Sequence, residues 1–212
     1  MLQLKHTVSF FAIFGVGLFS CKDKEPPRKP EPEKIIYKID TSNAQPQTEA
    51  TRAPIINISD TIAPREIVVY VKDSAKTSER IGIRLEHIFR KTLPEFFKKN
   101  KISKTGSRIV WYKSSSAPFY FEAGFPVNKR PKSTAKNILV RDIGGDSALV
   151  AHFYGPYHLT YEAYEVLREQ LKNAHKKPAG SPYEKYIIPA IDSTGRARDP
   201  YKVLTDIVFP YR

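Results

Sequence analysis

The sequence predicts an α+β domain made of two strand–helix–strand–strand modules, with a largely antiparallel sheet and two main helices. Runs rich in β-branched and aromatic residues, bounded by Gly, Pro or polar residues, indicate strands. Two stretches with apolar residues three or four positions apart indicate helices. These patterns recur in the same order over roughly Arg65–Val127 and Ile138–Arg212. Neither half could bury its sheet face well alone, so we expect one domain with the modules related by a pseudo-two-fold axis.

The first 20 residues read as a targeting segment. A basic residue precedes an apolar run, residues 7–19, which is too short to span a bilayer comfortably. The run ends in LFSC and resembles the lipobox of bacterial lipoproteins, which implies cleavage before Cys21 and its acylation, for example by palmitate. Cys21 is the only cysteine, so no intramolecular disulfide can form. The alternative is an ordinary signal peptide or anchor in which the cysteine occurs by chance.

Residues 21–64 are expected to be the lipidated cysteine followed by a flexible linker, because Pro and mixed charge predominate there. The lysine-acid start resembles the tethers of surface-exposed lipoproteins. This resemblance implies a lipid-anchored protein of the cell envelope, in the outer rather than the inner membrane. The run Ile55–Ile62 is ambiguous, and we expect the folded domain, residues 65–212, to start near Arg65.

The first module begins with a β-branched strand, Glu66–Lys72. A helix follows, and its apolar face comprises Ile81, Leu85, Ile88, Phe89 and Leu93. Pro94 should kink or restart that helix, since its ring clashes with the preceding turn. The segments Ile109–Lys113 and Phe119–Phe125 read as the next two strands, and a basic loop, Lys129–Asn137, leads to the second module.

The second module opens with a strand from Ile138 and a second strand that ends at Gly155-Pro156. Helical spacing starts at Leu159 and ends before Pro178 and Gly180. Tyr183–Ile188 and a segment near the C-terminus, Leu204–Pro210, complete the expected sheet. Phe89, Phe96, Phe97 and Phe153 read as core residues rather than site residues.

Three segments of this half, HFYGPYHLTYEAYEVL, GSPYEKYIIPA and PYKVLTDIVFP, resemble the GyrI-like domain. That domain is a small-molecule-binding module that also forms the effector-binding part of some bacterial transcription activators. The matching positions are Gly155, Pro156, Tyr157, Ala163, Tyr164, Leu167, Pro182, Glu184, Tyr186, Leu204, Thr205, Asp206, Ile207 and Pro210, with Asp206 where glutamate is usual. The resemblance implies a central ligand cleft between the two modules, with Glu184 as the main ligand contact.

The residues themselves also point to Glu184, an acid in an otherwise apolar strand. A partly desolvated carboxylate among aromatic rings favours a cation. The alternative is an ion pair with Lys185 or another surface lysine. The aromatic residues proposed as cleft walls are Trp111, Tyr112, Tyr120, Tyr154, Tyr183 and Tyr186, and the weaker candidates are Glu122, His152 and Asp206.

The formal net charge of +13 allows nucleic acid, anionic lipid or acidic polymers as partners. The basic residues are scattered among loops and helix ends, and the sequence shows neither a helix-turn-helix pattern nor a cluster of zinc ligands. We therefore expect no nucleic-acid partner, no metal and no cofactor. His152, His158 and His175 are too widely spaced to indicate a metal site.

The leading hypothesis is an extracytoplasmic lipoprotein that binds a small aromatic or cationic molecule in the cleft. An enzymatic alternative is a hydrolase of small cyclic or activated amides and esters that uses a pocket glutamate. A third hypothesis is an envelope protein-interaction module with a closed cleft. The sequence names no catalytic residue, shows no G-x-S-x-G or H-E-x-x-H motif, and leaves the ligand and the oligomeric state open.

Overall fold

The computed structural model of the protein describes residues 52–192 and 194–212. The predicted signal peptide, the acylation at Cys21 and most of the predicted linker lie outside the described residues. Within the described ranges, no helix has both the length and the apolar character needed to cross a membrane.

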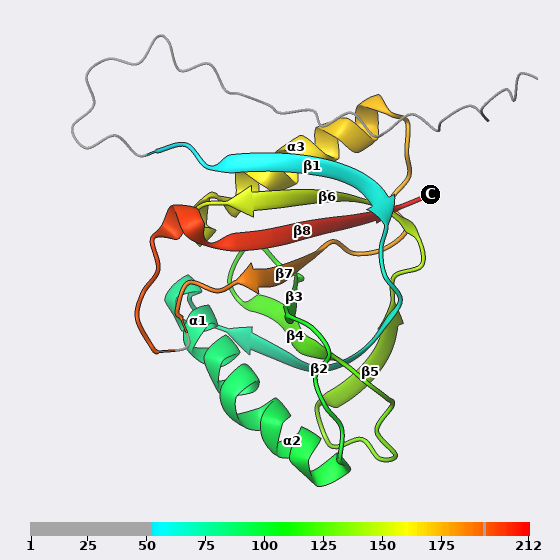
Figure 1. Ribbon diagram of the computed structural model, residues 1–212, viewed down its shortest axis with the longest axis vertical. Helices are drawn as coiled ribbons and strands as arrows, with labels where there is room; N and C mark the ends of the chain where they lie inside the picture. The colour runs from blue at the N-terminus through cyan, green and yellow to red at the C-terminus, as the bar shows by residue number, and fades with distance from the viewer. Residues whose placement is uncertain (1–51, 193) are drawn as a thin grey trace, which may run out of the picture. The chain divides into compact units, whose positions relative to one another are not determined.

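In the described residues, eight strands form one antiparallel sheet with the order β1-β6-β8-β7-β3-β4-β2-β5 (Figure 1). The strands are β1 (Ile55–Ile62), β2 (Glu66–Ala75), β3 (Arg108–Tyr112), β4 (Phe119–Val127), β5 (Ile138–Ile143), β6 (Ser147–Tyr154), β7 (Tyr183–Ile188) and β8 (Leu204–Tyr211). The predicted α+β class and the two strand–helix–strand–strand modules are confirmed. The modules meet where β3 pairs with β7, at the centre of the sheet.

The helix of the first module is α1 (Ser78–His87), a π-helical turn (Ile88–Thr92) and α2 (Leu93–Asn100) in one continuous run. The restart expected at Pro94 is observed: α2 begins at Leu93, and Pro94 lies in its first turn, where its missing N–H is tolerated. The irregularity lies just before it, where the Leu93 N–H donates to the Ile88 carbonyl five residues earlier.

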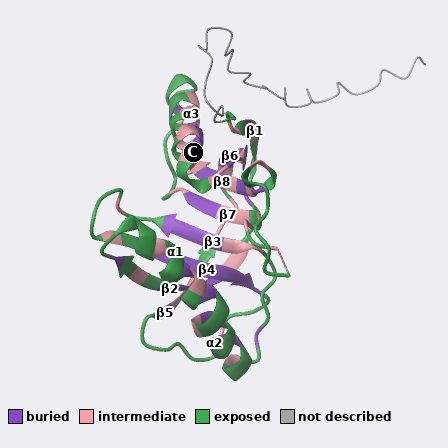
Figure 2. Cartoon of the chain, turned by 90° about the vertical axis from the view of Figure 1, so that its left-hand side faces the viewer, coloured by how far each residue is buried: buried purple, intermediate pink, exposed green. Residues whose placement is uncertain are grey.

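The second module carries α3 (Thr160–Asn173), preceded by a 3₁₀ turn at Tyr157–Leu159. A further 3₁₀ turn, Pro200–Lys202, leads into β8. The helices of both modules cover the same face of the sheet: α1 packs on β2 and β4, and α3 packs on β6 and β8. Figure 2 shows buried residues concentrated on the strands and exposed residues on the outer sides of the helices.

Side chains on the helix-covered face form two apolar clusters, one for each module. The four phenylalanines predicted to be core, Phe89, Phe96, Phe97 and Phe153, are all buried there, which confirms that prediction. The opposite face of the sheet holds a third cluster. It comprises Ala63, Val68, Tyr70, Ile109, Trp111, Ala148, Val150, Tyr183 and Val208.

Each module receives a strand from the chain segment that leads into the other module. β1 precedes the first module in sequence but pairs with β6 of the second. β5, predicted to open the second module, instead pairs with β2 of the first, so that part of the prediction is wrong. The predicted domain start near Arg65 is therefore wrong, because β1 belongs to the sheet. Only Ile56 and Ile58 of this strand are buried, so its apolar alternation is too short to be distinctive.

The two strand exchanges place two short connections side by side. The Ala63 N–H donates to the Asp146 carbonyl at 3.0 Å, and the Gly145 N–H donates to the Ala63 carbonyl at 2.7 Å. Gly144 has φ +79°, and a Cβ at this position would lie 1.9 Å from the Pro64 carbonyl oxygen. This close crossing therefore needs a residue without a side chain.

Candidate functional site

A cavity of about 950 Å³ opens between α1 and α3, above the central strands β3 and β7. Its floor comes from alternate residues of the two strands, and its walls come from the facing sides of the two helices. The cavity therefore lies where the two modules meet. The lining residues are Ser78, Ile81, Gly82, Leu85, Glu86, Phe89, Arg108, Tyr112, Lys113, Ser114, Ser115, Tyr157, His158, Thr160, Tyr161, Tyr164, Arg168, Pro182, Glu184 and Tyr186.

Glu184 lies on the cavity floor and is only 4% exposed. Its direct neighbours on the adjacent strands are Val110 and Ile207, which offer no polar partner. The Tyr164 hydroxyl donates to Glu184 Oε1 at 3.2 Å. Burial raises the pKa of Glu184 to about 7, against the opposing effect of the Tyr186 and Tyr164 hydroxyls. Among the described residues Glu184 makes no ion pair, so the predicted alternative of a pair with Lys185 does not apply; Lys185 pairs with Glu66 instead.

Tyrosines surround this carboxylate. The hydroxyls of Tyr112 and Tyr186 lie 2.8 Å apart, and the rings of Tyr157 and Tyr186 have centroids separated by 5.4 Å. Burial, together with the charge of Glu184, raises the pKa of both Tyr164 and Tyr186, so these phenols stay neutral. They offer hydroxyl groups to Glu184 and ring faces to a ligand.

The α1 side of the cavity combines apolar surface with one ion pair. The Arg108 guanidinium donates to Glu86 Oε1 at 2.6 Å and lies 5.0 Å from the centroid of the Phe89 ring. Burial opposes ionisation of Glu86, but the Arg108 contact prevails and lowers its pKa. Glu86 also pairs with Arg90, so this one carboxylate is shared by two arginines, whereas Glu184 has no cationic partner among the described residues.

Three of the seven primary ligand-binding candidates line the cavity: Glu184, Tyr112 and Tyr186. Trp111 and Tyr183 instead pack together on the opposite face, with ring centroids 5.5 Å apart. They are 2% and 3% exposed. Successive side chains of a strand point to opposite faces, so neighbours such as Trp111 and Tyr112 cannot line the same cavity.

Tyr120 and Tyr154 are not among the lining residues either. Tyr120 is 54% exposed and lies on the sheet face opposite the helices, as does Glu122 two positions further along β4. Sequence reasoning missed Tyr157 and Tyr164, although both lie within the matched motifs. Tyr164 lies on the predicted helix, whereas Tyr157 precedes it in a 3₁₀ turn, so helical spacing alone did not group them. Glu86 and Arg108 had no sequence signal either, because their pairing depends on the tertiary fold.

The weaker candidates His152 and Asp206 also lie away from the cavity. His152 Nδ1 is 2.7 Å from Asp206 Oδ1, and His152 Nε2 is 3.1 Å from the Ser59 hydroxyl. The hydrogen bond that the His152 ring donates to Asp206 raises the pKa of His152, partly opposed by burial. Ser59 lies within the regular strand β1, not at the sharp turn that exposes a nucleophilic serine.

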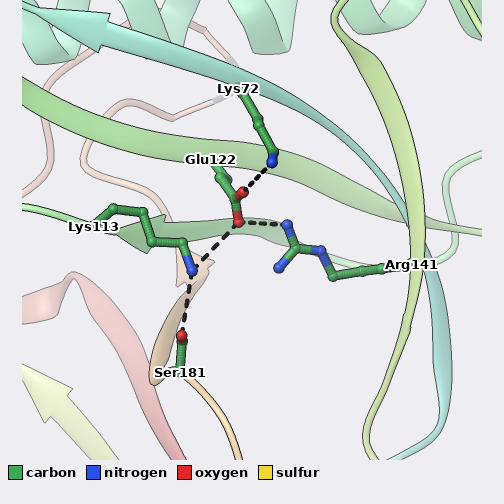
Figure 3. Close-up of polar contacts among 5 residues, drawn as sticks. All are labelled: Lys72, Lys113, Glu122, Arg141 and Ser181. Carbon is green, nitrogen blue, oxygen red and sulfur yellow. Dashed lines mark hydrogen bonds and ion pairs between the residues drawn. The ribbon is translucent and has the colours of Figure 1, made fainter.

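Glu122 is buried on the sheet face opposite the cavity. Lys72, Lys113 and Arg141 surround its carboxylate, and Ser181 contacts Lys113 (Figure 3). Burial opposes ionisation, but the Arg141 hydrogen bond and the two lysines lower the pKa of Glu122. Glu122 is therefore an ionised anchor for three cations. Across the described ranges, no group of three His, Cys, Asp or Glu side chains is arranged to hold a metal ion.

No model of a protein family matches this sequence, and no curated protein matches it. Solved structures do. The crystal structure of the EcmrR C-terminal domain aligns with a TM-score of 0.60 at 20% identity, over 76% of this chain and 99% of that one. EcmrR in a complex with DNA aligns equally well over 75% of this chain, which covers 57% of the EcmrR chain. SAV2435 bound to tetraphenylphosphonium aligns at a TM-score of 0.49 and 11% identity, over 73% of this chain and 93% of that one, too loosely to carry an argument.

At 20% identity, the likeness to EcmrR concerns the fold. It covers nearly the whole of that C-terminal domain and supports the architecture expected from the GyrI-like resemblance. The geometry of the cavity, rather than the likeness, carries the argument about function.

Proposed function

We propose that this domain is a receptor for a small molecule with a cationic centre and an aromatic or apolar body. The observation that carries the proposal is Glu184, a buried carboxylate on the floor of an open cavity, whose side-chain partners within the described residues are hydroxyl groups alone. The cavity volume of about 950 Å³ lies within the range of ligand sites, which is roughly 300–1,000 Å³.

Charge and shape favour the same ligand class. An ionised carboxylate at this depth has lost its water and has gained hydroxyl partners alone, so a cation would restore much of the lost stabilisation. The rings of Tyr157, Tyr164 and Tyr186 surround the same position, and each favourable cation–π contact contributes about 0.5–2 kcal/mol. Among the described residues, the ion-pair partner of Arg108 is Glu86, which Arg90 also contacts, and not Glu184.

The proposal keeps the predicted membrane anchor. Acylation of Cys21 would attach the receptor to the cell envelope, in the outer membrane, with its ligand in the surrounding aqueous phase. The sequence pattern ending in LFSC supports this part. Cys21→Ser should abolish processing and membrane retention, measured by fractionation of cells. Unchanged retention of the variant would reject the anchor and leave the receptor proposal standing.

The binding proposal can be tested with two ligands of matched shape and opposite charge, tetraphenylphosphonium and tetraphenylborate. Calorimetric titration at pH 8 should detect binding of the phosphonium alone. Glu184→Gln should weaken that binding at least about tenfold, because the counter-charge is lost. Glu169→Gln, an exposed change on α3 with the same charge difference, should leave it unchanged. Equal binding of both ligands, or an unaffected Glu184→Gln variant, would reject the proposal.

A hydrolase remains the second candidate function, favoured by the pKa of Glu184. A general base works best when its pKa lies near the operating pH, and a value of about 7 meets that condition. Turnover of activated esters that is lost in Glu184→Gln while ligand binding persists would identify an enzyme. Binding without turnover would identify a receptor.

The third hypothesis required a cleft closed by Trp111 and the tyrosines. Trp111 lies on the other face of the sheet, and the cavity is open. The geometry therefore favours a small ligand over a protein partner as the occupant of this site.

A further inference from the structure

The cluster around Glu122 brings together three cations from three different parts of the sheet. Lys72 lies on β2, Arg141 on the edge strand β5, and Lys113 directly after β3 (Figure 3). Glu122 on β4 pairs in register with both Lys72 and Trp111. The cluster thus lies on the face of the sheet opposite the helices, and it is built by tertiary structure rather than by sequence neighbours.

The cluster carries two more positive charges than negative ones. Within residues 52–192 and 194–212, Glu122 is the only ion-pair partner of each of the three cations. Asp73, the acid next to Lys72 in sequence, pairs with Arg84 instead. One carboxylate therefore serves three cations, in a part of the protein where Glu122 is shielded from solvent.

The cations also retain unused hydrogen-bond donors. Lys72 Nζ and Lys113 Nζ lie 3.6 Å and 3.5 Å from the Glu122 oxygens, beyond ordinary hydrogen-bond length. Lys113 Nζ has a 3.3 Å contact with the Ser181 hydroxyl, whereas each ammonium group can donate three bonds. Buried Nε of Arg141 has no acceptor among the described residues.

Aromatic rings hold the guanidinium of this cluster in place. The Arg141 guanidinium carbon lies 3.8 Å from the Tyr70 ring centroid and 4.5 Å from that of Trp111, and the same group donates to Glu122. A planar guanidinium fixed in this way is pre-organised, so it loses little freedom when it binds an oxyanion. Lys72 has the most exposed side chain of the three cations, so its ammonium group is the most accessible to a ligand from solvent.

We propose that Lys72, Lys113 and Arg141 form a binding site for a small dianion of the phosphate type. A dianion would balance the two excess positive charges, and its several oxygens could accept from the unused ammonium donors and the Ser181 hydroxyl. Glu122 is then a positioning residue that holds the three cations together when the site is empty. This inference does not depend on the proposed function of the cavity.

The two sites are neighbours, because Lys113 and Pro182, next to Ser181, also line the cavity. A bound dianion would reduce the positive charge near the cavity. Any effect of phosphate on cation binding in the cavity must be matched by an equal effect of the cation on phosphate binding.

The test is a titration of the protein with inorganic phosphate and with sulfate at constant ionic strength, followed by calorimetry. Saturable binding is expected, weakened about tenfold or more in Lys72→Gln and in Lys113→Gln, since each loses a charged donor. Lys98→Gln, an exposed change on α2 with the same charge difference, should bind as the unmodified protein does. Absence of saturable binding, or equal weakening by all three variants, would overturn the proposal.

Glu122→Gln separates a ligand site from a purely structural cluster. In the proposed site, removing the internal anion should tighten phosphate binding, so phosphate should raise the melting temperature of Glu122→Gln more than that of the unmodified protein. A cluster that only stabilises the fold would be weakened by the substitution, and phosphate would not restore it. That result would overturn the proposal.

Two sources could present the same dianion, a free phosphomonoester and a phosphomonoester lipid headgroup. Vesicles of phosphatidylcholine with and without phosphatidic acid distinguish them. Lys72-dependent binding to the phosphatidic acid vesicles would assign the site to a lipid headgroup. Binding of inorganic phosphate without vesicle binding would assign it to a soluble ligand.

Discussion

Glu184 shows how burying one ionisable side chain in a binding site raises the free energy needed to ionise it. Its carboxylate lies between Val110 and Ile207 on the sheet, and Tyr164 offers it a neutral hydroxyl rather than a charge. In such surroundings the protonated form is favoured, which is why its pKa rises to about 7. The cost of ionising this group is the free energy that a cationic ligand can recover.

This cost should appear as a pH-dependent difference in stability between the protein and Glu184→Gln. The folded protein holds the Glu184 proton more tightly than the unfolded chain, whose pKa is near 4.5. The stability contributed by the protonated carboxyl is fully present below pH 4.5 and is lost as the pH rises through 7. Gln imitates the neutral form, so its advantage should grow over this range by about 3 kcal/mol.

Urea denaturation at several values between pH 4 and pH 8 measures this difference, with Glu169→Gln as the control. The control should differ from the unmodified protein by a constant amount. A constant difference for Glu184→Gln as well would contradict the raised pKa of Glu184.

At the residue scale, the sequence predicted the chemical character of the site, an acid among aromatic rings, better than it predicted which residues line the cavity. Glu184, Tyr112 and Tyr186 were predicted and line the cavity. Trp111 and Tyr183 were predicted from composition, and strand alternation excludes them once the face of one neighbour is known. Sequence alone could not reveal which face the helices cover, since both faces of these strands carry aromatic residues.

At the scale of elements, the π turn between α1 and α2 sets the rotation of α1 relative to α2. A π turn holds one more residue than an α turn, and one residue in a helix corresponds to a rotation of 100°. On one side of this turn, Leu85 and Glu86 face the cavity, whereas on the other side Phe96 and Phe97 are buried in the core. The extra residue lets both sets face inward.

Deletion of Lys91, an exposed residue of this turn, should therefore cost more than its lost contacts. A regular helix would turn Leu85 away from the core, and the expected loss is about 2–5 kcal/mol, the range for removing one buried leucine. Phosphonium binding should weaken as well. Lys91→Ala keeps the turn and should stay within about 0.5 kcal/mol of the unmodified protein. A deletion variant as stable as Lys91→Ala would show that the turn is dispensable.

Most elements could be predicted from periodicity, and the exceptions have physical reasons. Pro94 correctly indicated a break in the first helix: the π turn lies just before it, and proline is accommodated in the first turn of α2. One strand was missed. β1 was ambiguous because only Ile56 and Ile58 face the core. A strand with so few buried residues owes its place to pairing with β6, which its own sequence does not encode.

At the scale of the described domain, the crossing of the two connections at Gly144 holds the ends of the sheet together. Gly144→Ala should destabilise the domain by at least about 2 kcal/mol, because φ is positive and the added Cβ would clash with the Pro64 carbonyl. Gly82→Ala is the matched control. It lies within α1, and its Cβ would meet no atom within 4 Å.

Substituting glycine by alanine should therefore change the stability of the domain in opposite directions at the two positions. Alanine is favoured over glycine in a helix, so Gly82→Ala should stabilise by up to about 1 kcal/mol. Thermal denaturation of the two variants measures both effects. A Gly144→Ala variant that melts with or above the unmodified protein would show that the crossing can relax.

Because β1 pairs with β6 and β5 pairs with β2, the two halves of the chain exchange one strand each, as two subunits do in a strand-swapped dimer. A cut in the loop between β4 and β5, residues 128–137, would leave each fragment with a strand inserted in the other's sheet. The nicked fragments should co-migrate in gel filtration and separate only in denaturant. The loop would then act chiefly to keep the two partners at high local concentration. The cavity is lined by residues of both halves, so a molecule bound there would stabilise their association.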